Sequence, residues 1–166
     1  SATVSGSGSS WSATYVVVEA DVSEGAASVS IVFEDRASND GEDVSSVTDS
    51  SVVTIDLTVP EILTVSISSD NTADTTRANA GDTVTVVFST SESIVTPSVQ
   101  IAGQEAAVSG SGASWEAAYV VVANQVTEGA TAIRIEYADI ASNVGVAADA
   151  TTDESVVTLD LTPPTL

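Results

Sequence analysis

The sequence predicts an all-β protein built as an antiparallel two-sheet sandwich. Apolar residues alternate with polar ones in short runs, and clusters of Gly, Asp, Ser and Asn separate these runs. About seven such runs fall within roughly 100 residues, a spacing that is typical of sandwich domains. Sustained helical periodicity occurs nowhere in the chain.

An internal repeat divides the chain. The stretch VSGSGASWEAAYVVV at 108–122 matches VSGSGSSWSATYVVV at 4–18, and Trp115 follows Trp11 by 104 residues. A period of this size is that of a whole domain. Residues 61–166 then form one complete repeat. Residues 1–60 match only its later part, so we expect the missing first strands to lie upstream or to come from a neighbouring chain.

The predicted strands of the complete repeat each carry apolar residues at every second position, which places these side chains on one face. In chain order the expected inward residues are Leu63, Val65 and Ile67; Val84, Val86 and Phe88; Val99 and Ile101; Trp115, Ala117, Tyr119 and Val121; Ile133, Ile135 and Tyr137; and Val157, Leu159 and Leu161.

The segments between these runs have the composition of turns and loops. Residues 68–82 are polar and predict a long loop after the first strand. Pro97 suits the first residues of the third strand, because proline is tolerated where a strand begins. Gly110-Ser-Gly112 predicts a tight hairpin, and residues 139–145 predict another loop before the last strand.

The charge balance excludes some partners. Three Arg and no Lys stand against 24 acidic residues, for a net charge of −21. Such a surface repels nucleic acid and anionic lipid and attracts cations. The longest apolar run has seven residues, at 117–123, which is far shorter than a membrane span, so the sequence predicts no membrane insertion.

The composition also argues against catalysis. The chain has no His, Cys or Lys, which leaves carboxylates, hydroxyls and tyrosines as possible reactive groups. A two-carboxylate glycosidase is formally possible. However, a site that is written twice at a fixed period is unusual for an enzyme, and we expect none here.

Several short motifs in the repeat resemble a known family. GDTVTV at 81–86, SESI at 91–94, YADIASNVG at 137–145 and TLDLTPP at 158–164 resemble, in this order, the bacterial immunoglobulin-like repeats of very large surface proteins and adhesins. The resemblance implies an immunoglobulin-type sandwich in tandem copies, an extracellular or cell-surface location, and often calcium at the junctions. Ser142 stands where such repeats commonly have Gly.

Acidic residues at the expected junction are the candidate ligands of an ion. Calcium takes six to eight oxygens, from carboxylates and backbone carbonyls. In an immunoglobulin topology the loops at 91–95 and 139–147 lie where the chain enters through 56–60. We therefore expect Asp56, Glu92 and Asp139 to hold a calcium ion, with carbonyls of the linker.

Other aspartates are further candidates for the same role. Asp160 and Asp35 would play the matching parts at the following and preceding junctions, and Asp70 and Asp74 would lie at the opposite end of the repeat. The alternative is that these aspartates serve only to form turns.

Three functions are compatible with these observations. The leading hypothesis is an extender, a repeat whose length and stiffness hold a terminal region away from the cell, with neighbouring repeats of the same chain or identical chains as partners. The rival is a filament subunit, in which a strand from another chain completes 1–60. A carbohydrate-binding module would need exposed aromatic rings, whereas Trp11 and Trp115 share strand parity with Tyr and Val, as core residues do.

Overall fold

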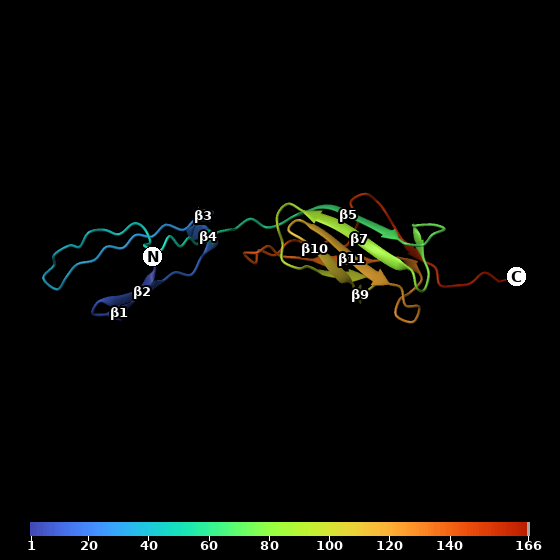
Figure 1. Ribbon diagram of the computed structural model, residues 1–166, viewed down its shortest axis with the longest axis horizontal. Helices are drawn as coiled ribbons and strands as arrows, with labels where there is room; N and C mark the ends of the chain where they lie inside the picture. The colour runs from blue at the N-terminus through green and yellow to red at the C-terminus, as the bar shows by residue number, and fades with distance from the viewer. Residues whose placement is uncertain (166) are drawn as a thin grey trace. The chain divides into compact units, whose positions relative to one another are not determined.

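The computed structural model describes residues 1–165 and divides the chain into two compact units, Ser1–Leu57 (unit 1) and Thr58–Leu166 (unit 2). Strands are the main regular secondary structure in both units, and most of their pairing is antiparallel (Figure 1). The predicted all-β class is therefore confirmed, with one short 3-10 turn at Glu19–Asp21 (η1).

Unit 2 contains a four-stranded antiparallel sheet. Its order is β10 (Ala107–Ser111), β11 (Ser114–Val120), β7 (Thr83–Thr90) and β5 (Ile62–Ser69), and Figure 1 shows these four strands side by side. The central pairing places Trp115 opposite Phe88 and Ala117 opposite Val86. Both pairs point to the buried face, as alternation of side chains along a strand requires.

Two three-stranded sheets complete unit 2. One has the order β13 (Ile133–Glu136), β8 (Ser98–Ile101) and β9 (Gln104–Glu105). The other has the order β12 (Gly129–Ala130), β14 (Thr158–Leu159) and β6 (Arg77–Ala78), and its β14–β6 pair is parallel. The three sheets enclose one core in a sandwich-like arrangement.

The core of unit 2 contains the aromatic and aliphatic residues that alternation predicts. Phe88, Trp115, Ile135, Tyr137 and Leu159 are buried in a single cluster, and Tyr119 packs against it half-buried. Burying side chains of this size contributes roughly 1.5–3 kcal/mol each. The core explains why short two-residue strands such as β12 and β14 can persist.

The structure contradicts the prediction that Leu63, in the first strand of the repeat, faces the core. Leu63 is exposed, whereas Val65 and Ile67 are buried and Ile62 packs against the core. The register between β5 and β7 shifts between Ile62 and Thr64, as a β-bulge does when it inserts one extra residue. This extra residue reverses the alternation on its N-terminal side, which the sequence pattern does not reveal.

The long loop predicted at 68–82 is also shorter than expected. Strand β5 continues to Ser69, and β6 forms at Arg77–Ala78 by pairing with β14. Ala78 is buried against the core. A two-residue strand held by a partner about 80 positions away leaves no local pattern, because its stability comes from that partner.

Unit 1 contains one hairpin, one pair of two-residue strands and long connections. β1 (Thr3–Ser7) pairs with β2 (Ser10–Thr14), and β3 (Gly25–Ala26) pairs with β4 (Thr54–Ile55) (Figure 1). None of its described residues is buried. Unit 1 thus has local pairing without a hydrophobic core.

Candidate metal centre

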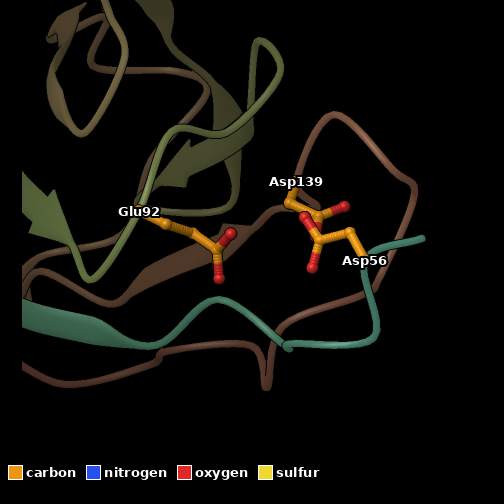
Figure 2. A group of neighbouring side chains, drawn as sticks. All are labelled: Asp56, Glu92 and Asp139. Atoms are coloured by element: carbon orange, nitrogen blue, oxygen red, sulfur yellow. The ribbon is translucent and has the colours of Figure 1, made fainter. Parts of the chain in front are cut away.

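Three carboxylates from separate parts of the sequence meet near the start of β5. One oxygen each of Asp56, Glu92 and Asp139 lies within 4.8 Å of the other two. Figure 2 shows the three side chains turned toward a common point, each from a different segment of backbone. Asp139 is buried, and Asp56 and Glu92 are half-buried. We refer to these three residues as the acidic triad.

Asp139 is fixed by the loop that it begins. Its Oδ1 accepts the backbone N–H of Asn143 at 2.8 Å, and its Oδ2 accepts the side-chain amide of Asn143 at the same distance. The backbone N–H of Asp139 in turn donates to the carbonyl of Asn143. Each carboxylate oxygen has a second lone pair, so this arrangement positions the carboxylate and still leaves it able to bind a cation.

Backbone contacts bring the loop that contains Glu92 beside Asp139. Ile94 forms an isolated antiparallel bridge with Asp139, and the Val95 N–H donates to the carbonyl of Ala138 at 3.0 Å. The Thr90 hydroxyl donates to the carbonyl of Glu92 at 2.6 Å. These bonds close the loop after β7 and direct it toward the 139–143 loop.

A second pair of bonds attaches the segment before β5 to the same loop. The N–H of Ser91 donates to the carbonyl of Glu61 at 2.8 Å, and the N–H of Glu61 donates to the Ser91 hydroxyl at 2.9 Å. Pro60 is buried beside them. These bonds attach the residues just before β5, a few positions after Asp56, to the loop after β7.

The chemistry of the triad suits a hard cation. Three carboxylates this close repel one another, and a divalent ion removes that repulsion. All three side-chain ligands are oxygens, the type that calcium and magnesium prefer, and the triad has none of the nitrogen or sulfur ligands typical of zinc. Calcium would complete its six to eight ligands with backbone carbonyls and water.

Asp35 occupies the same kind of loop in unit 1, but within residues 1–165 it belongs to no group of three close acidic side chains. Its carboxylate accepts the N–H groups of Ala37 and Asn39 at 2.8 and 2.9 Å and the Asn39 side-chain amide at 2.8 Å. These bonds lower the pKa of Asp35, and the bond from the Asn39 side chain contributes most to this lowering.

The remaining predicted ligands form no second group of three close carboxylates within residues 1–165, although Asp74 and Asp160 each lie 3.7 Å from the guanidinium of Arg77. Asp160 is exposed, with its Oδ2 3.7 Å from a guanidinium nitrogen of Arg77. Asp74 accepts the N–H and hydroxyl of Thr76, which lower its pKa, and Asp70 accepts the Thr83 N–H at 2.7 Å. Asp70 and Asp74 thus organise turns, and elsewhere in residues 1–165 no three acidic side chains approach as closely as the triad.

Sequence reasoning did not assign a role to Glu128, which holds the segment after β14. Its Oε1 accepts the Leu161 N–H at 2.6 Å and the Thr162 hydroxyl at 2.8 Å, and these bonds, Thr162 first, lower its pKa. Glu24 accepts the Leu57 N–H in the same way. The recurrence of Glu-Gly-Ala at 24–26 and 128–130 was the available signal.

Comparison with known protein families, with characterised proteins and with solved structures finds no match to this chain. Within residues 1–165, none of the chain forms a helix with the length and hydrophobicity that crossing a bilayer requires.

Proposed function

We propose that this chain is a structural extender, a piece of tandem immunoglobulin-like sandwich repeats in a long extracellular bacterial surface protein. The observation that carries this proposal is that the same local structures occur at positions 104 residues apart. In both the Asp35–Asn39 loop and the Asp139–Asn143 loop, the asparagine donates its backbone N–H and its side-chain amide to the aspartate carboxylate. A chain that consists of repeated copies of one module is long and stiff.

The acidic triad gives this extender its means of stiffening. We propose a calcium ion between Asp56, Glu92 and Asp139, where Asp56 precedes the buried Pro60 by four residues. The ion would tie the linker at 56–60 to the two loops at 91–95 and 139–143. The net charge of −21 favours such an ion over any anionic ligand.

An enzymatic role has less support. The chain has no His, Cys or Lys, and the three close carboxylates could hold a cation. Trp115 is buried, which removes this ring as a stacking platform for a sugar.

Small-angle X-ray scattering of the chain, with calcium and with a chelator, tests this function. We expect a single well-defined maximum dimension with calcium and a broader distribution of distances with the chelator, while circular dichroism shows the β structure of unit 2 unchanged. Asp160→Asn is the matched control, because Asp160 is the sequence counterpart of Asp56 but lies outside the triad. An unchanged distance distribution on calcium removal would refute the stiffening role.

A further inference from the structure

Unit 1 exposes a set of apolar side chains whose counterparts, 104 positions later, form the core of unit 2. Trp11 is 63% exposed, against 8% for Trp115, and Ile31 is 50% exposed, against 0% for Ile135. Further exposed residues with buried or half-buried counterparts are Tyr15, Val17, Val29, Phe33 and Val53. We call these seven residues the open face.

The backbone under the open face already has the conformation seen in unit 2. In β1–β2, Gly6 pairs with Trp11 and Val4 with Ala13, as Gly110 pairs with Trp115 and Val108 with Ala117 in β10–β11. The glycines are required there, because a Cβ on Gly6 would meet the backbone of Trp11 at 2.7 Å. The strand pairing of unit 1 therefore matches that of unit 2, although no described residue covers its apolar side chains.

Unit 2 shows which strands cover the equivalent residues. On β11, Trp115, Ala117 and Tyr119 pair with Phe88, Val86 and Val84 of β7. On β13, Ile133 and Ile135 pair with Ile101 and Val99 of β8. Among the residues that the structure describes, β2 pairs only with β1, and the edge of the 29–32 segment that corresponds to the β8 side of β13 has no strand beside it.

We propose that the open face is an acceptor site for an extended polypeptide segment with the residue pattern of 61–104. The segment would add antiparallel to β2, with its Phe opposite Trp11 and its two preceding alternate Val residues opposite Ala13 and Tyr15. This pairing would reproduce, at the matching positions of unit 1, the pairing between β11 and β7 in unit 2. Strand addition of this kind satisfies the open backbone edge and buries alternate side chains at once.

The size of the open face is sufficient for such a partner. Seven large side chains at roughly half exposure leave on the order of several hundred Å² of apolar surface in water. This amount approaches the ~800 Å² per partner that stable interfaces bury.

A second folded copy of the chain does not fit the site. Its own β7 and β8 already lie in the core of unit 2, where Val86, Phe88 and Val99 are fully buried. Offering these strands to unit 1 would expose that core. The occupant is therefore a segment that is not yet paired, and the proposal does not depend on the calcium ion.

Two single-tryptophan variants of the full chain test the proposal. Trp115→Phe leaves Trp11 as the only indole, and Trp11→Phe leaves Trp115. The probe is a synthetic peptide of residues 61–104. In Trp115→Phe, we expect the peptide to reduce iodide quenching of Trp11 to the level seen for Trp115, with saturation at one peptide per chain. In Trp11→Phe, quenching should not change.

A control peptide and a second measurement complete the design. A 61–104 peptide with Val86→Asp and Phe88→Asp should have no effect, because it cannot present the two side chains opposite Trp11 and Ala13. Hydrogen exchange on the unsubstituted chain should slow at residues 11–17 with the unmodified peptide. The proposal is overturned if Trp11 stays accessible, if both peptides act alike, or if sedimentation shows that the chain alone forms a dimer that protects Trp11.

Discussion

Trp11 and Trp115 make the same hydrogen bond in very different surroundings. The indole N–H of Trp11 donates to the carbonyl of Gly8 at 3.1 Å, and that of Trp115 donates to the carbonyl of Gly112 at 3.0 Å. Only Trp115 is buried. The hairpin geometry is thus encoded by the local sequence, whereas burial depends on the strands that pack on the ring.

This difference predicts unequal costs for two matched substitutions. Trp115→Ala should destabilise unit 2 by about 3–5 kcal/mol, because it empties a site in a packed core. Trp11→Ala should leave the unfolding of unit 2 within about 0.5 kcal/mol of the original. Urea denaturation followed by far-ultraviolet circular dichroism measures both. A cost below about 1 kcal/mol for Trp115→Ala would mean that the ring contributes little to the core.

The loop begun by Asp139 allows a second matched pair. Asp139→Ala removes the acceptor of two Asn143 hydrogen bonds at a buried position and should cost about 1–3 kcal/mol. Asp35→Ala removes the equivalent bonds at an exposed position, where water replaces them, and should cost less. Thermal unfolding with a chelator present keeps any effect of an ion out of the comparison. Equal costs would contradict the role assigned to burial.

Ser142 offers a stabilising substitution. Its φ of 75° lies in the left-handed region, as does the φ of 61° of Ser38 in the matching loop. A non-glycine residue in this region destabilises the folded state by about 1–2 kcal/mol. Glycine removes this strain, but part of the gain is lost because glycine also increases the conformational entropy of the unfolded chain. Ser142→Gly should therefore raise the stability of unit 2 by up to about 1 kcal/mol. A lower melting temperature would show that the serine side chain contributes more than this strain costs.

The Glu128 carboxylate should make the stability of the folded chain depend on pH in the acid range. Hydrogen bonds from Thr162 and Leu161 lower its pKa below the ordinary 4.5 in the folded chain. A lowered folded pKa contributes stability above pH 4.5, and this contribution is lost as the pH falls through the folded value. The melting temperature should therefore fall below pH 4.5, and Glu128→Gln should reduce the slope there. An unchanged slope would assign the acid sensitivity to other carboxylates.

The Tyr137 phenol should make the stability of the folded chain depend on pH in the basic range. Burial raises its pKa above 10.0, with Glu61 adding to the shift and a bond from Ile62 opposing it. A raised folded pKa contributes stability below pH 10, which is lost as the pH rises through the folded value. Tyr137→Phe should flatten the fall of the melting temperature above pH 10. If the fall persists, ionisation of this phenol is not its cause.

Much of the fold followed from periodicity in the sequence, and the exceptions have a common cause. The buried faces of β7, β8 and β11 were predicted because Val86, Ile101 and Trp115 lie on regular alternating strands. Leu63 was misplaced because a bulge depends on the partner strand β7. The pairing of β6 with β14 was missed for the same reason, since it joins distant residues.

In the candidate site, too, the locally encoded part could be predicted from the sequence, whereas the part that depends on contacts between distant residues could not. The Asp and Asn pattern of 139–143 specifies a loop from local sequence alone, and the same pattern produces the loop at 35–39. The approach of Glu92 to this loop depends on the Ile94–Asp139 bridge and on the Glu61–Ser91 bonds. Only an assumed topology could predict those contacts, because the sequence around Glu92 has no feature that specifies them.

A calcium titration of the chain by isothermal calorimetry tests the proposed ion most directly. We expect one site that requires the acidic triad, with Glu92→Gln and Asp56→Asn each weakening calcium binding by more than about tenfold. Asp160→Asn, which removes an exposed carboxylate outside the triad, should leave that site unchanged. No calcium binding to the unsubstituted chain, or equal affinity in all four proteins, would contradict the account and leave these aspartates as turn formers.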